Sequence, residues 1–158
     1  HHRIANYWRP YHDALQTLID ENHTTFGQAI LIDCHSMPHE ALNNVDIGNG
    51  KRPDVVLGDR FGASAAPFIV EQVETAFASA GLTVARNMPF AGAYIAQHYG
   101  RPSRDQHAIQ IEIDRALYMN EATLEPLPDF DAVRLALSDV IRRVADIGRD
   151  TQAALAAE

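Results

Sequence analysis

Short apolar runs alternate along this chain with longer segments of helical periodicity, and this alternation limits its possible folds more than any other feature. Four runs have the length and apolar content of buried strands: residues 29–33, 54–58, 82–86 and 107–113. Three segments place apolar side chains every three or four positions, as amphipathic helices do: residues 4–22, 67–80 and 129–148. The alternation predicts an α/β fold, with a sheet of at least four strands and helices on both faces.

Two segments between the expected strands have the composition of loops. Residues 37–53 are rich in Asn, Gly, Pro and Asp, and residues 87–102 are rich in Gly, Pro and aromatic side chains. Loops longer than about 12 to 15 residues in compact domains are usually functional or disordered. Since ligands of α/β folds bind outside the strand ends, we expect a site near these loops.

The size and charge of the chain exclude several classes of protein. Its 158 residues suit one domain spanning residues 1–158. The 13 Lys and Arg against 21 Asp and Glu give a net charge of −8, which argues against nucleic acid or an anionic membrane as partner. With no apolar run of about 20 residues and no secretory signal, we expect a soluble, cytoplasmic protein.

The cysteine content and the start of the chain each carry one expectation. Cys34 is the only cysteine, so a metal would take His and carboxylate ligands rather than a thiolate cluster. The chain opens on His1 rather than Met and enters a helical pattern at once. This start predicts that the N-terminal part of a longer domain is missing.

Asp33 and His35 stand two residues apart at the end of the first expected strand. In extended backbone both side chains point to the same side of the sheet, and Cys34 points to the other, where we expect a small buried group. A histidine in this position can bind a metal, with the aspartate accepting its second N–H. The alternative is a core or capping histidine with no chemical role.

Glu112 lies in the strand pattern Ile-Gln-Ile-Glu-Ile, on the same side as Gln110. A central strand of a layered fold has no wet face, so an unpaired carboxylate there is costly. Glu112 is therefore expected either to form a salt bridge with Arg86 or Arg115, or to act as a general acid and base.

Three arginines stand in polar or glycine-rich settings: Arg60, Arg86 and Arg101. A guanidinium held in a rigid turn suits two-point capture of a substrate carboxylate, whereas plain surface charge is the alternative for each. Arg60, in Gly-Asp-Arg-Phe-Gly, is the best binding candidate because glycines flank its turn.

Ordered motifs from about residue 4 to residue 120 resemble the N-formylglutamate amidohydrolase family. The matching segments are Tyr7 to His12, Asp33 to Pro38, Arg52 to Gly62, Ala85 to Asn87 with Tyr94, His98 to Pro102, and Gln110 to Arg115. The resemblance implies a three-layer α/β/α fold with a mixed central sheet, similar to zinc carboxypeptidases. It also implies zinc-dependent hydrolysis of N-formyl-L-glutamate to formate and L-glutamate, a step of histidine degradation.

The same resemblance implies roles for individual residues. His35 would bind one zinc ion, Asp33 would be its hydrogen-bond partner, and Glu112 would be the general acid and base. The substrate-binding candidates are Arg60, Arg86, Asn87 and Tyr94. The family's upstream Pro-His motif and acidic residue, which complete its metal site, have no counterpart here, so we expect an incomplete zinc site.

Three functions stay open at this point. One is hydrolysis of N-formylglutamate, and the second is hydrolysis of another small acidic N-acyl amino acid, since related pockets vary. The third is a non-catalytic domain of the same fold that binds a small acidic ligand. An incomplete domain would leave a sheet edge exposed, so a homo-oligomer formed through this edge is also expected.

Overall fold

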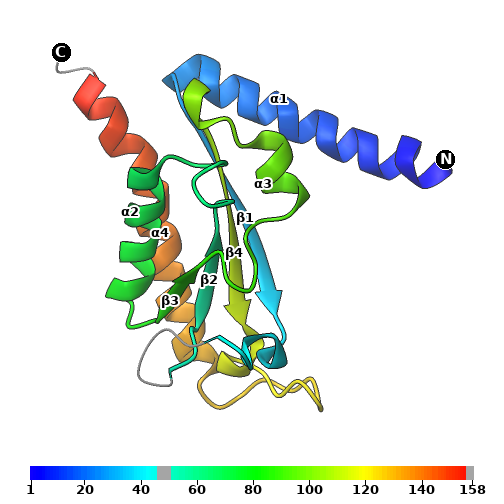
Figure 1. The fold of residues 1–158 in the computed structure, drawn as a ribbon, viewed down its shortest axis with the longest axis vertical. Coiled ribbons are helices and arrows are strands. Elements are labelled where there is room, and N and C mark those ends of the chain that lie inside the picture. Colours follow the sequence, from blue (N-terminus) through cyan, green and yellow to red (C-terminus); the bar gives the residue numbers. More distant parts are fainter. Residues whose placement is uncertain (46–50, 156–158) are drawn as a thin grey trace.

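The computed structural model describes residues 1–45 and 51–155, and it places four strands in one sheet in the order β1-β4-β2-β3 (Figure 1). Their bounds are β1 Ala29–Met37, β2 Val55–Gly58, β3 Val84–Arg86 and β4 Gln106–Asp114. β1 runs parallel to β4 and β2 parallel to β3, whereas β2 and β4 are antiparallel. The predicted mixed sheet is confirmed.

Three of the four α-helices among the described residues also follow the predicted segments, and the short third one does not. The helices are α1 Arg9–Phe26, α2 Pro67–Ser79, α3 Tyr94–Tyr99 and α4 Phe130–Leu155, with a π-helical turn, Ile4–Trp8, before α1. Pro10 is the second residue of α1, which directly follows the π-helical turn. α1 ends at Gly27, whose φ of +71° is left-handed and favours glycine.

Helices α2 and α4 cover one face of the sheet. Val55 and Leu57 of β2 and Ile109 of β4 are fully buried there against Val73 of α2 and Val140 of α4. Complete burial of a Val or Ile side chain contributes about 1.5–3 kcal/mol, so this cluster is the main apolar core.

Helices α1 and α3 cover the upper part of the other face. Ile19 of α1 and Tyr99 of α3 pack there with Ala29 of β1 and Ala108 of β4. His12 Nδ1 lies 2.6 Å from the Tyr99 hydroxyl and joins the two helices. The prediction of helices on both faces is therefore confirmed. Polar side chains of β1 and β4 lie on this second face between that cluster and a smaller apolar cluster of Met37, Leu42 and Val56.

Two predicted loops differ from the structure. Met37 belongs to β1 and a 3₁₀ turn spans His39–Leu42, while residues 46–50 of the expected loop lie outside the described residues. α3 lies within the segment 87–102, which was expected to be irregular. Its six residues are too short to give a helical period of their own, and tertiary packing of Ala96 and Tyr99 holds them.

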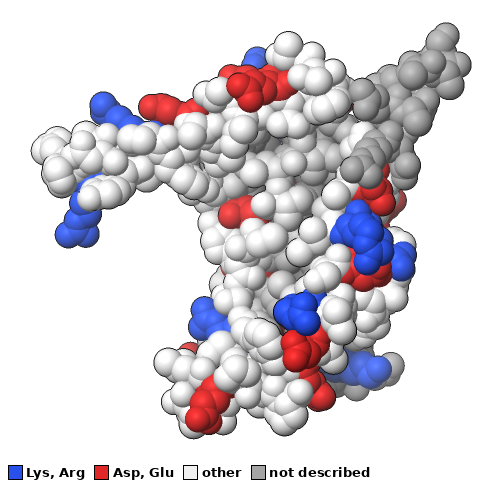
Figure 2. All heavy atoms as spheres, turned by 180° about the vertical axis from the view of Figure 1, so that it is seen from behind, with Lys and Arg blue, Asp and Glu red and all other residues white. Residues whose placement is uncertain are grey.

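The N-terminal part of α1 projects beyond the sheet, and the surface is hollowed beneath it (Figures 1 and 2). Across the sheet from Glu112, β1 and α4 line a separate apolar groove of about 700 Å³. Cys34 lines this groove and is exposed, so the prediction of a buried thiol is wrong. None of the described helices is both long and apolar enough to span a membrane.

Candidate active site

The candidate site lies on the face shared with α1 and α3, where polar side chains of β1 and β4 meet. The strand register pairs His35 with Glu112 and Asp33 with Gln110. Along its other edge β4 pairs with β2, where Val56 is the register partner of Glu112 and Gly58 is the register partner of Gln110. Neighbouring strands lie about 4.8 Å apart, so residues distant in sequence form one compact patch.

Asp33 and His35 lie side by side along β1. His35 Nε2 lies 3.0 Å from Asp33 Oδ2, and the side chains are 47% and 18% exposed. With the proton on Nε2 facing the carboxylate, Nδ1 keeps the lone pair that could bind a metal. The two side chains thus lie within contact distance, and the exposed imidazole is accessible to ligands.

Glu112 is 7% exposed, and a glutamine supports its carboxylate. Gln110 Nε2 donates to Glu112 Oε1 over 2.6 Å, while Gln110 Oε1 accepts from the Ala93 N–H over 2.6 Å. The arginines considered as salt-bridge partners are engaged elsewhere, Arg86 with Glu74 and Arg115 with Ser36 and Glu121. The buried carboxylate therefore faces the candidate site without either arginine.

A strained turn follows β2 and holds Arg60. Arg60, Phe61 and Asn87 have φ angles of 55°, 57° and 60°, a left-handed region that non-glycine residues rarely adopt. Asn87 Oδ1 accepts from the backbone N–H groups of Asp59 and Phe61, and Asn87 Nδ2 donates to Asp59 Oδ1 over 2.6 Å. Backbone strain of this kind costs of order 1–3 kcal/mol per residue and persists only where surrounding bonds impose it.

These bonds change the interpretation of Asn87. Its side chain is 8% exposed and its amide is committed to the turn rather than pointed at a ligand. Arg60 is half-buried, and its N–H donates to Ala91 O over 2.7 Å. Asn87 thus fixes the backbone that carries Arg60.

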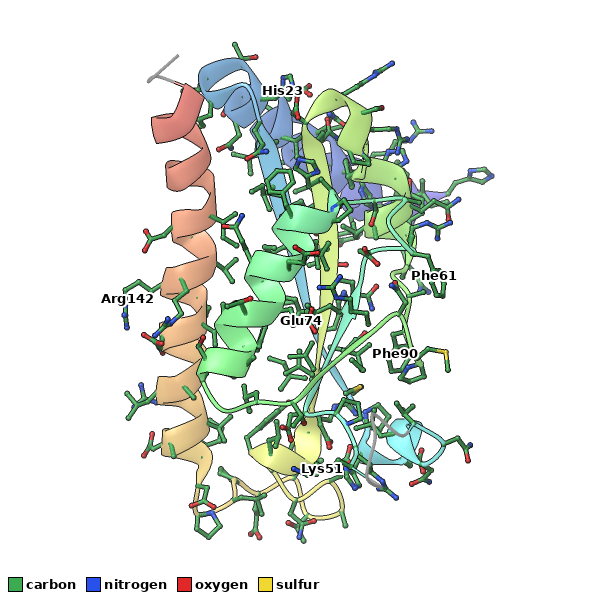
Figure 3. All side chains as sticks on the ribbon, turned by 60° about the vertical axis from the view of Figure 1, so that its left-hand side comes forward. His23, Lys51, Phe61, Glu74, Phe90 and Arg142 are labelled. Carbon is green, nitrogen blue, oxygen red and sulfur yellow. The ribbon has the colours of Figure 1, made fainter. Side chains whose placement is uncertain are left out.

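Tyr94 and Arg86 were both expected to bind substrate, and the structure separates them. Tyr94 is 45% exposed and follows Ala93, which is bonded to Gln110, so it lies beside the site. Arg86 is the register partner of Leu57 and pairs with Glu74 of α2, on the opposite face from Glu112. Figure 3 labels Glu74 on α2, and Phe61 and Phe90 on the other side of the sheet. Arg86 therefore does not join the site.

The remaining histidines near the site serve other contacts. His39 Nδ1 lies 2.6 Å from Asp114 Oδ2, and its Nε2 accepts from Arg52. The His98 ring stacks on Tyr94 with ring centroids 5.0 Å apart. Within residues 1–45 and 51–155, no three His, Cys, Asp or Glu side chains gather to hold a metal ion.

Zinc therefore fits the described residues only in part. Catalytic zinc usually takes three protein ligands, and here His35 with its Asp33 partner supplies one.

His107 is a structural histidine on the α2 face. It is 1% exposed, and its Nδ1 accepts from the Ala66 N–H over 3.2 Å, which leaves the ring proton on Nε2. Nε2 faces the Gln28 amide at 3.3 Å, and the buried Gln28 Oε1, which has no other partner, can accept this proton once the amide is turned. Burial lowers the pKa of His107, against a smaller raising effect of Asp105.

This lowered pKa predicts how stability depends on pH. The unfolded chain protonates His107 near its ordinary pKa of about 6.5, before the folded chain does. Its contribution is therefore complete above that pH, and the free energy of unfolding should fall as the pH drops below it. Urea titrations between pH 5 and 8 should show that the free energy of unfolding depends less on pH in His107→Gln than in the parent chain. The control His98→Gln, at an exposed histidine, should keep the pH dependence of the parent chain. Identical curves for His107→Gln and the parent chain would contradict this assignment.

Gln110 and Asp59 are the contributors to the site that sequence reasoning gave no role. Gln110 shared the polar side of its strand with Glu112, which was the available signal. Asp59 stood in the glycine-rich motif, but its bond to Asn87 depends on the pairing of β2 with β3. Which loops lie next to each other at the strand ends is known only once the strand order is known.

Comparisons with known proteins show which family the chain resembles. A family model described as N-formylglutamate amidohydrolase matches residues 1–119. An N-formylglutamate deformylase of Pseudomonas putida is 38% identical over 119 residues, 75% of this chain and 43% of that protein. One of Pseudomonas aeruginosa is 31% identical over 153 residues, 95% and 56% respectively.

A solved structure gives the same result. The crystal structure of an N-formylglutamate amidohydrolase from Ralstonia eutropha JMP134 matches with a TM-score of 0.79 at 36% identity, covering 94% of this chain and 52% of that one. The chain thus spans about half the length of the proteins it matches.

Proposed function

The chain belongs to the N-formylglutamate amidohydrolase family, and we propose that it takes part in the hydrolysis of N-formyl-L-glutamate to formate and L-glutamate. The observation that carries this proposal is the pairing of a buried glutamate with an accessible histidine, Glu112 beside His35, across β1 and β4. Amide hydrolysis needs a group that accepts a proton from water and later donates one to the leaving nitrogen.

We assign that role to Glu112. Its Oε1 is occupied by Gln110, so Oε2 is the atom that takes the proton as water attacks the formyl carbon. The C–N bond then breaks, and the same proton passes to the amine nitrogen of glutamate. Water supplies the second oxygen of the product, and its other proton is released when formic acid ionises to formate, which balances the reaction.

We further propose His35 as one zinc ligand, oriented by Asp33. When bound, zinc would polarise the formyl oxygen and acidify a water molecule. At least two more ligands have to come from outside the described residues, because these residues gather no three-donor group.

Arg60 is proposed to bind a carboxylate of the substrate. The turn that carries it is held by Asn87 and Asp59, and its stem lies against Gly92, where a Cβ would be 3.3 Å from Arg60 Cγ. A guanidinium held in this way loses little side-chain freedom when it binds a carboxylate. Tyr94, next along the bonded 91–93 turn, would form a wall of the same pocket.

Arg60→Ala is expected to raise KM for N-formylglutamate roughly 10- to 100-fold, with a smaller change in kcat, because a hydrogen bond to a charged group is lost in substrate and transition state alike. The matched control is Arg86→Ala, which removes an arginine on the opposite face. Initial rates over a range of substrate concentrations measure both constants. A larger KM effect from Arg86→Ala would place the carboxylate elsewhere.

The proposed function is tested by formate release from the purified full-length protein that contains these residues, with and without added zinc. N-formylglutamate should be hydrolysed faster than N-acetylglutamate or N-formylaspartate. Faster hydrolysis of N-acetylglutamate or N-formylaspartate would favour a hydrolase for another N-acyl amino acid. Binding of acidic N-acyl amino acids in calorimetry, without turnover, would favour a binding domain. The incomplete donor set is the observation that keeps the binding domain as an alternative.

Two further expectations remain proposals. Along its outer side β1 has no strand partner among the described residues, and an unpaired edge of nine residues favours association with a second copy. Sedimentation at increasing concentration tests this. A place in histidine degradation in the cytoplasm follows only from the family resemblance.

A further inference from the structure

We propose that Gln110 is a positioning residue that clamps the general base Glu112 to the turn that carries the substrate-binding side chains. The inference deepens the proposed function and rests on it for the role of Glu112. Gln110 is 4% exposed and lies on β4 between Asp33 of β1 and Gly58 of β2. Both ends of its side-chain amide are bonded.

The hydrogen-bond partners allow one orientation of this amide. The Ala93 N–H can only donate, so the carbonyl oxygen of Gln110 must face it, at 2.6 Å. The NH₂ group must then point toward Glu112, and it lies 2.6 Å from Oε1. A carboxylate can only accept, so the two bonds fit together without conflict.

One consequence concerns the base itself. With Oε1 held by Gln110, rotation of the Glu112 carboxylate is restricted, and Oε2 is the oxygen that this bond leaves available to accept a proton. A base held in a fixed direction needs less reorganisation when it accepts a proton.

The other consequence concerns the turn at residues 91–93. Ala91 O accepts from the Arg60 N–H over 2.7 Å, Gly92 lies against the Arg60 stem, and Tyr94 follows Ala93. The single Gln110 side chain therefore fixes the distance between the proton acceptor and the groups proposed to hold the substrate.

The test replaces Gln110 with methionine, which has similar length but no hydrogen bonds. The matched control is Gln106→Met on the same strand, which loses a bond to Tyr99 O remote from Glu112. In Gln110→Met the Ala93 amide should exchange with solvent about tenfold faster by NMR, since it loses its acceptor. In Gln106→Met that exchange should be unchanged.

Kinetics complete the test. Gln110→Met should lower kcat for N-formylglutamate roughly 10- to 100-fold, the usual cost of a misplaced catalytic group. In the Glu112→Gln background the same substitution should have little further effect, because Gln110 acts through Glu112. Equal losses of kcat in both backgrounds would overturn the proposal and leave Gln110 a structural residue.

The exchange measurement separates this proposal from the proposed function. Unchanged Ala93 exchange in Gln110→Met overturns the clamp whatever the activity. Absence of turnover in the zinc-loaded full-length protein contradicts the proposed function, and faster Ala93 exchange would then still support the clamp itself.

Discussion

Glu112→Gln should lower kcat for N-formylglutamate by about 10²- to 10⁴-fold, the range by which general acid and base catalysis accelerates reactions. The substitution keeps the shape of the side chain, and its new carbonyl oxygen can still accept from Gln110. A neutral amide cannot take a proton from water or return it to the leaving nitrogen. Substrate affinity, which depends on other side chains, should change little.

The measurement is formate release at saturating substrate, together with calorimetric substrate binding. Glu71→Gln is the matched control, because Glu71 is exposed on α2 and lies away from the site. A circular dichroism melt checks that the variant remains folded. Turnover within a few fold of the parent chain would exclude Glu112 as the base and shift the role to another group.

The sheet could be predicted because the apolar runs that form its strands are recognisable in the sequence. Val55 to Leu57 and Ile109 to Ile111 are buried on both sides and have few alternatives to a central strand. Asp33, His35 and Glu112 could be placed on faces by the period of two within each strand. That His35 lies directly beside Glu112 depends on register, which is a property of two strands together.

Arg86 shows where sequence reasoning fails. Alternation puts Arg86 on the same side as Val84, but only the packing of α2 shows that this side is the apolar core. The ion pair with Glu74 then follows from the position of α2. The side chain of Asn87, the next residue, bonds instead to the turn that carries Arg60, so the two adjacent candidates have separate roles.

The packing of the 91–93 turn against β2 also could not be predicted from the sequence. Gly58 is the register partner of Gln110, and the backbone of Ala91 and Gly92 crosses directly above it. A Cβ at Gly58 would lie 2.7 Å from the Ala91 carbonyl carbon and 2.9 Å from Gly92 Cα. These distances are shorter than non-bonded atoms tolerate, and both neighbours are backbone that cannot rotate away.

Gly58→Ala is therefore expected to lower the free energy of unfolding by about 1–3 kcal/mol or more, the usual cost of overpacking. The added methyl group pushes the 91–93 turn away, which breaks the bonds from Arg60 to Ala91 and from Ala93 to Gln110. The turnover of N-formylglutamate should fall together with the stability, since those bonds hold the proposed base and the proposed carboxylate-binding arginine in their relative positions.

Gly148→Ala supplies the matched control with the opposite sign. Gly148 lies within α4, and a Cβ built there meets nothing within 4 Å. Because alanine loses less backbone entropy in a helix, this substitution should raise the free energy of unfolding by about 0.5–1 kcal/mol. Urea denaturation of both variants measures the pair. Equal stability of the two would show that the turn moves aside from Gly58 at no cost, and that close packing over β2 does not fix the site.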